Sequence, residues 1–163
     1  MNISEFLLIS SAIVPDRNAL IFEREEITFS SLQQQVNNLA SNLSQKGITT
    51  EDRIAVMDVN CPQLAQIFFA SNQLDAVYVP INFRARAEEL SQMLKACEPK
   101  ILFIGRRYMP LLKDTELTSE MVVVATDSSD FTELLAGDGE QSNFPEHDSH
   151  DTSVIMFTAG TTG

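Results

Sequence analysis

The last six residues combine the residue types that proteins use to hold a phosphate group. Residues 158–163 read Thr-Ala-Gly-Thr-Thr-Gly and follow an apolar run over residues 153–157. Glycine lets the backbone approach a ligand closely, and threonine hydroxyls add donors for phosphate oxygens or ligands for Mg²⁺. Backbone N–H groups that follow a buried strand can form an anion-binding concavity. The spacing therefore favours a phosphate loop after a strand.

A turn without any chemistry fits the same six residues and stays open as an alternative. Gly160 lies only three residues before Gly163 and no lysine follows, so the segment is not a Walker A loop, which needs Gly, four residues and then Gly-Lys-[Ser/Thr]. A nucleotide site here would need a cation from elsewhere.

Apolar runs alternate with helical patterns along most of the chain. The runs are continuously apolar, which is typical of strands buried on both faces of a parallel sheet. We predict an α/β fold with a parallel, doubly wound sheet flanked by helices. Ligands of such sheets bind at the carboxyl ends of the strands, where the Thr/Gly loop lies. The expected strands are 53–57, 77–79 (stopped by Pro80), 101–104, 121–125 and 153–157, and the expected helices are 62–74, 87–97, 108–113 and 131–136.

A small β-hairpin is expected near the N-terminus, over residues 19–22 and 26–29. Thr28 or Ser30 can cap the helix that follows, and Gly47 occupies the position of a glycine that ends it. Phe68, Phe69, Phe83 and Phe103 are expected in the core rather than against a cofactor.

Composition and charge exclude several classes of partner. Eleven basic and 23 acidic residues give a net charge of −12, so we expect no nucleic-acid partner. No apolar run approaches the ~18 residues of a membrane span, and the short run at 6–9 follows Glu5 rather than basic residues. We expect a cytoplasmic protein with Cys61 and Cys97 reduced.

The length suits one domain, and we interpret residues 1–163 as a single α/β unit. Residues 137–151 are rich in Gly, Asp, Glu, Ser and His and read as an acidic surface connection before the last strand. His147 and His150 have the spacing of a helical metal pair, but their segment reads as loop, so no metal site is predicted.

Several landmarks in order resemble the adenylate-forming, or AMP-binding, superfamily. That superfamily includes acyl-CoA synthetases, luciferases and the adenylation domains of peptide synthetases. Residues 151–163 resemble its phosphate loop, which usually reads Tyr/Phe-Thr-Ser-Gly-Thr-Thr-Gly and continues with a variable residue, Pro, Lys and Gly. The segments 26–29, 51–56, 60–62, 76–82 and 89–90 resemble successive family segments upstream of that loop. Ala159 departs from the usual serine, and Glu51 and Asp75 stand where the family generally has glycine.

The resemblance implies activation of a carboxylic acid by Mg·ATP, with coenzyme A as the common thiol acceptor. It implies phosphate contacts from Thr158, Gly160, Thr161, Thr162 and Gly163. The loop lysine, the Mg²⁺ glutamate and the mobile C-terminal domain follow this point in the family. We therefore expect a truncated N-terminal part of a larger AMP-binding domain, without a catalytic residue of its own and inactive alone. The acid is not identified.

Three other readings stay open. In the first, the chain is part of an adenylation domain that loads a carrier-protein thiol. In the second, it is a non-catalytic binding or scaffold module from a truncated or split gene. In the third, it is a small nucleotide sensor. Arginines 84, 86, 106 and 107 are the only basic concentrations, suited to anion or coenzyme A binding or to surface ion pairs. If neighbours of the sheet are missing, an open edge or face predicts a homo-oligomer or strand exchange.

Overall fold

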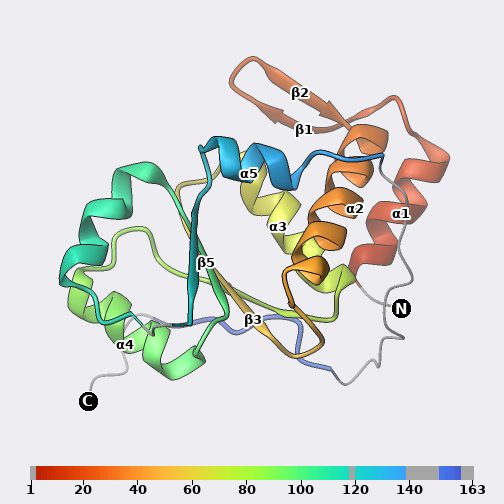
Figure 1. The fold of residues 1–163 in the computed structure, drawn as a ribbon. Coiled ribbons are helices and arrows are strands. Elements are labelled where there is room, and N and C mark those ends of the chain that lie inside the picture. The colour runs from red at the N-terminus through yellow and green to blue at the C-terminus, as the bar shows by residue number, and fades with distance from the viewer. Residues whose placement is uncertain (1–2, 118–119, 139–150, 159–163) are drawn as a thin grey trace.

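The computed structural model describes residues 3–117, 120–138 and 151–158. A four-stranded parallel sheet forms its centre, in the spatial order β4-β3-β5-β6 (Figure 1). The predicted α/β fold is confirmed. The strands are β3 (Arg53–Met57), β4 (Val77–Pro80), β5 (Ile101–Ile104) and β6 (Val122–Ala125).

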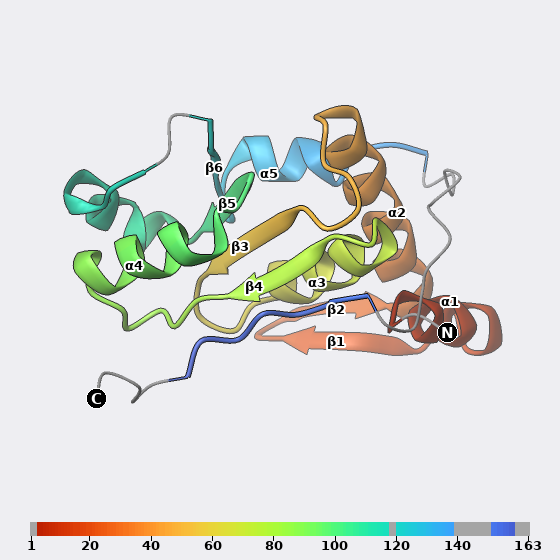
Figure 2. The same ribbon diagram turned by 90° about the horizontal axis from the view of Figure 1, so that it is seen from below.

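Helices cover both faces of the sheet, as Figure 2 shows. Ile54, Val56 and Phe103 face a core shared with α1 (Ile3–Ile13), α2 (Phe29–Gln45), α3 (Pro62–Gln73) and α5 (Ser129–Leu134). Ala55 and Leu102 face the opposite core, shared with α4 (Ala87–Cys97) and the 3-10 helix η1 (Arg106–Asp114). Successive strand residues point to opposite faces, so burial on both sides requires the continuous apolar runs that the sequence shows.

The connections leave β3 and β5 in opposite directions. The chain leaves β3 through α3 to reach β4 on one side, and leaves β5 through η1 to reach β6 on the other. The two connections also lie on opposite faces. The carboxyl ends of β3 and β5 therefore flank the topological switch point, where open α/β sheets bind ligands.

The predicted hairpin and the helix signals that follow it are confirmed. Strands β1 (Asn18–Phe22) and β2 (Glu25–Thr28) pair antiparallel. Thr28 caps α2, because its hydroxyl accepts a hydrogen bond from the Ser31 amide at 3.2 Å. Gly47 follows the helix with φ of +89°, a conformation that glycine adopts without steric cost. None of the helices among the described residues is both long and apolar enough to cross a membrane.

The strand predicted over residues 153–157 is the main correction. Only Val154 is paired, through a single parallel bridge to Tyr78 of β4. The Tyr78 amide points outward and donates to the Ser153 carbonyl at 3.0 Å. Two residues on, Pro80 occupies the next outward position and has no N–H to donate. The ladder therefore stops after one bridge, although β4 itself continues through Pro80 rather than ending before it.

Helix α1 was not predicted, and two short elements differ in extent. Helix α1 buries only Leu7, while Phe6 and Ile13 are exposed, so it lacks the one-sided pattern that marks an amphipathic helix. The helix predicted at 108–113 is the longer 3-10 helix η1, and the one predicted at 131–136 begins and ends two residues earlier, as α5.

Candidate phosphate-binding edge of the sheet

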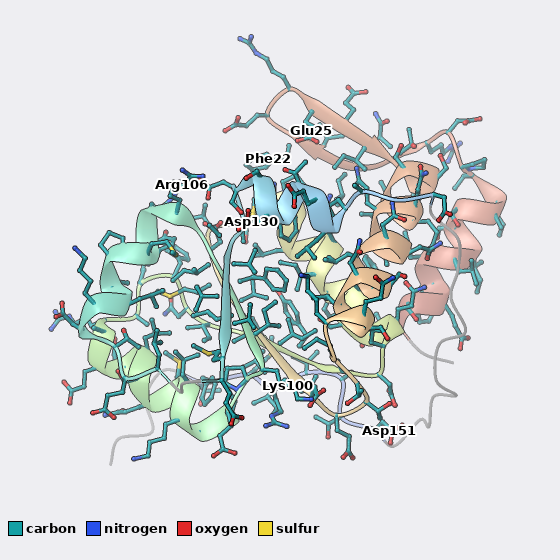
Figure 3. All side chains as sticks on the ribbon, in the orientation of Figure 1. Phe22, Glu25, Lys100, Arg106, Asp130 and Asp151 are labelled. Atoms are coloured by element: carbon teal, nitrogen blue, oxygen red, sulfur yellow. The ribbon has the colours of Figure 1, made fainter. Side chains whose placement is uncertain are left out.

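All four strands and the bridged segment run parallel, so the residues that follow them gather at one edge of the sheet, the carboxyl edge. Asp58 follows β3, Gly105 follows β5 and Thr126 follows β6. Residues 81–86 follow β4, and Thr158 lies beyond the bridge at Val154. Figure 3 shows the two ends of β5 marked by Lys100 and Arg106, with Arg106 at the carboxyl edge. This is where the sequence predicts a phosphate site.

Thr158 is exposed at the end of a segment that the sheet holds in place. The Tyr78 carbonyl accepts a hydrogen bond from the Ile155 amide at 3.0 Å. Val154 packs against one core and Ile155 against the other, as in a strand. The segment then runs along β4 towards the carboxyl edge (Figure 2). Gly160, Thr161, Thr162 and Gly163 lie outside the described residues, so their phosphate contacts stay predictions.

Asp58 joins the ends of three strands at the switch point. Its carboxylate accepts hydrogen bonds from the Thr126 hydroxyl at 2.6 Å and from the Val59 amide at 2.8 Å. A β-carbon at position 105 would overlap the same carboxylate, so Gly105 permits its close approach. Sequence reasoning missed these residues. Their shared signal is that each directly follows a buried strand.

Two arginines and two aromatic rings form a second group at this edge, the arginine–aromatic cluster. The Arg84 guanidinium lies 5.3 Å from the centre of the Phe83 ring, and that of Arg107 lies 6.0 Å from the centre of the Tyr108 ring. The two rings are 6.4 Å apart. Among the described residues neither arginine is in an ion pair. The prediction of Phe83 as a core residue is wrong, since the chain turns outward after β4 and leaves it exposed.

Of the other two arginines, only Arg106 has a recorded partner for its guanidinium among the described residues. Arg106 pairs with Asp127 at 3.7 Å and donates to the Asp127 carbonyl at 3.2 Å, so its charge is offset. The Arg86 amide donates to the Glu89 carboxylate at 2.8 Å, which helps to begin α4. That bond is made by the main chain, so the basic character of the edge rests on Arg84, Arg86 and Arg107.

Two weakly acidic groups near the edge are held in their neutral forms. Burial raises the pKa of the Cys61 thiol above its ordinary 9.0, and the Asp58 charge adds to that shift. Burial likewise raises the pKa of Tyr78 to about 12. Near neutral pH neither group is therefore an ionised nucleophile.

Within the described ranges, no three His, Cys, Asp or Glu side chains gather in a way that could hold a metal ion. His147 and His150 lie outside those ranges. Cys61 and Cys97 are both free thiols.

Comparison with known proteins decides the family. The AMP-binding enzyme family matches residues 10–163. The chain belongs to this family. It is 33% identical over 144 residues to the putative acyl-CoA ligase YdaB of Bacillus subtilis, an alignment that covers 84% of this chain and 29% of YdaB. The chain thus spans less than a third of that relative.

Solved structures of similar proteins share the fold. The N-terminal domain of FACL13 from Mycobacterium tuberculosis superposes with a TM-score of 0.88 at 25% identity, covering 99% of this chain and 42% of that one. NpsA-ThdA, an artificially fused adenylation-PCP di-domain from Klebsiella oxytoca, superposes with a TM-score of 0.80 at 22% identity, covering 97% and 28%. The architecture is therefore that of the N-terminal subdomain of acyl-CoA synthetases.

Proposed function

We propose that this chain is the N-terminal part of an ATP-dependent acid–thiol ligase. In that reaction a carboxylate oxygen attacks the α-phosphorus of ATP, and the bond to the β-phosphate bridging oxygen breaks. Acyl adenylate and pyrophosphate form, and a thiol then displaces AMP to give a thioester. The observation that carries this proposal is the position of Thr158, which is exposed at the carboxyl edge and begins a family-typical phosphate loop.

The chain's own part in that reaction is to bind and orient the departing phosphates. The bridge at Tyr78 holds the residues just before the loop against the sheet. Backbone N–H groups and threonine hydroxyls of such a loop, when preorganised, stabilise charge on the phosphates. Bound Mg²⁺ would offset the remaining charge, which a chain of net charge −12 requires. Thr158 through its hydroxyl, and Gly160, Thr161, Thr162 and Gly163 in the same loop, are the proposed contacts.

Coenzyme A is the acceptor that we favour over a carrier-protein thiol. Coenzyme A carries phosphates and an adenine ring, and the arginine–aromatic cluster offers two guanidinium groups beside two exposed or half-buried rings. A carrier protein presents its thiol on a phosphopantetheine arm that has no adenine. The name of the relative YdaB, a putative acyl-CoA ligase, supports the same choice.

The test uses the protein encoded by the whole reading frame. Pyrophosphate release is measured with ATP and a panel of aliphatic and aromatic acids, with and without coenzyme A. We expect release with at least one acid, and a loss of about 10-fold or more in kcat/KM for ATP in Thr161→Ala, equivalent to ~1.4 kcal/mol. Thr132→Ala, an exposed threonine of α5, is the matched control. No release with any acid would count against the ligase.

The acceptor is tested separately. Arg84→Ala and Arg107→Ala should raise KM for coenzyme A several-fold and leave adenylate formation unchanged. Equal loss in both half-reactions would place these arginines elsewhere in the mechanism. Transfer to a phosphopantetheinylated carrier protein, but not to coenzyme A, would favour the adenylation-domain alternative.

The non-enzymatic alternatives are distinguished by the codons that follow Gly163. Pro-Lys-Gly and several hundred further codons favour the ligase, whereas a stop codon favours a binding or scaffold module. Calorimetric titration of the 163-residue chain with ATP tests the nucleotide-sensor alternative, which needs saturable binding by this part alone. Fractionation of the source cells tests the cytoplasmic location, which stays a prediction.

A further inference from the structure

A groove runs along α4, and Asp114, Glu116, Leu117 and Met121 from the segment that follows it in space form its other wall. It consists of two adjoining hollows of about 520 and 220 Å³, which share Lys95 and Glu116 in their walls. The Glu116 amide donates to the Ser91 hydroxyl at 3.0 Å and so fastens the segment to α4. The groove follows α4, whose place on the sheet Figure 1 shows. The proposed ligase chemistry uses none of its residues.

The walls of the groove are strongly acidic. Glu88 and Asp114 line the larger hollow, Glu98 lines the smaller one, and Glu116 lies between them. Lys95 is the single basic side chain in either wall. Among the described residues none of these five side chains forms an ion pair. The groove therefore presents an excess of exposed negative charge.

The smaller hollow is apolar at its base. Leu94 and Pro99 are buried there, and the exposed Leu117 and the half-buried Met121 complete the apolar wall. Met121 directly precedes β6, so this hollow opens onto the beginning of that strand. An apolar side chain entering it would remove Leu117 and Met121 from water.

Beside the hollow, β6 offers an open strand edge. Its only partner among the described residues is β5. The amides of Val122 and Thr126 both point to β5, donating to Lys100 and Ile104. Because backbone groups alternate, the amides of Val123 and Ala125 point away from the sheet. An exposed edge of this kind is a template for pairing with another extended segment.

We propose that this surface docks an extended segment of a partner protein whose side chains on one face are basic, with one apolar side chain among them. The segment adds a strand to β6 through Val123 and Ala125, so that every second side chain faces α4. On that face one apolar side chain enters the hollow over Leu94 and the cations align with the groove carboxylates. Backbone pairing supplies affinity, and the charge and the hollow supply specificity. A second copy of this chain fits poorly, because it would bring together two chains that each carry a net charge of −12.

The test uses the 163-residue chain and a fluorescein-labelled ten-residue peptide in which every second residue is lysine, except for one valine, and the residues between them are threonine. A twin peptide with glutamate for lysine is the charge control. We expect saturable binding of the lysine peptide by fluorescence anisotropy, and at least 10-fold weaker binding of the glutamate peptide. Equal binding of the two peptides, or no saturable binding of either, overturns the proposal.

Two variants test the two parts of the surface. Glu116→Lys should weaken binding of the lysine peptide about fivefold or more, and Glu133→Lys on α5 is its matched control. Val123→Pro removes an outward amide while keeping the ladder to β5, so it should also weaken binding. In the parent chain, peptide binding should slow hydrogen exchange of the Val123 and Ala125 amides, a measurement that does not depend on the variant folding. Unchanged exchange at both amides overturns the strand addition.

Discussion

The amide of Glu51 donates a hydrogen bond to the carbonyl of Asp75 over 2.8 Å, and both residues have positive φ, at 65° and 57°. The bond joins the turn before β3 to the turn before β4, so it fixes the relative positions of two neighbouring strands. These are the two positions where the related family generally has glycine. In this chain, side chains therefore occupy a backbone conformation that costs roughly 1 kcal/mol each.

Glu51→Gly is expected to stabilise the protein. The substitution removes the β-carbon from the left-handed conformation and keeps the amide that bonds to Asp75. We expect an increase of about 0.5 to 1 kcal/mol in the free energy of unfolding, measured by urea denaturation. Glu51→Ala is the matched control, since it shortens the side chain but keeps the β-carbon. Equal stability of the two variants would show that the backbone strain is not relieved.

The environment of Asp52 predicts that the free energy of unfolding falls at acidic pH. Its buried carboxylate forms an ion pair with the Lys100 ammonium at 2.7 Å and accepts a hydrogen bond from the Thr49 amide at 2.7 Å. Burial alone would raise the pKa of Asp52, but these partners outweigh it and hold the pKa below its ordinary value of 3.8. A carboxyl whose pKa is lower in the folded state stabilises the fold above pH 3.8. That contribution is lost as the pH falls through the lower, folded value.

Asp52→Asn tests this dependence. At pH 7 the variant should lose about 1 to 2 kcal/mol, because it keeps a weaker acceptor for Thr49 and gives up the ion pair with the half-exposed Lys100. The difference from the parent chain should shrink below pH 3.8, where the parent carboxyl also becomes neutral. Asp16→Asn, on an exposed loop, is the control. A difference that stays constant from pH 7 to pH 2 would contradict the ion-pair account.

The sheet could be predicted from sequence because its signal is strong and local. In β5 all four residues, Ile101 to Ile104, are buried. A strand that is covered on both faces requires such an uninterrupted apolar run. The extent of pairing in residues 153–157 could not be predicted, because it depends on the outward position of Pro80 in β4. Pairing between distant segments leaves no periodic pattern in either of them.

Buried polar residues were the least predictable feature. Asn37, Gln66 and Gln73 are buried between α2 and α3, although amides usually mark an exposed helix face. Gln73 donates to Asn37 at 3.0 Å, and Gln66 donates to Gln35 at 2.8 Å. Whether a polar residue meets such a partner is decided by helix packing. The same holds for Asp58 and Thr126, which lie 68 residues apart in sequence.

Gly105→Ala is expected to destabilise the carboxyl edge. The new methyl group would overlap the Asp58 carboxylate, which cannot move freely because Thr126 and Val59 hold it. We expect a loss of about 1 to 3 kcal/mol by thermal or urea denaturation. Adding Asp58→Ala removes the overlapping atoms, so the double variant should be at least about 0.5 kcal/mol more stable than the sum of the single effects. If the two stability effects are strictly additive, the side chains at positions 58 and 105 are not in steric contact.

Self-association is expected to depend on salt. Phe6 and Ile13 on α1 and Met156 beyond the bridge expose 59, 72 and 74% of their surfaces, and apolar surface of this kind favours contact between copies. The net charge of −12 opposes that contact at low ionic strength and is screened as salt is added. Light scattering should therefore give a mass near 18.1 kDa in dilute buffer and a larger mass at about 0.5 M salt. Ile13→Lys should reduce this rise in mass more than Ile21→Lys on the hairpin, because Ile21 is similarly exposed, at 68%, but lies on a different element. A mass that stays at the monomer value in both buffers at high protein concentration would rule the association out.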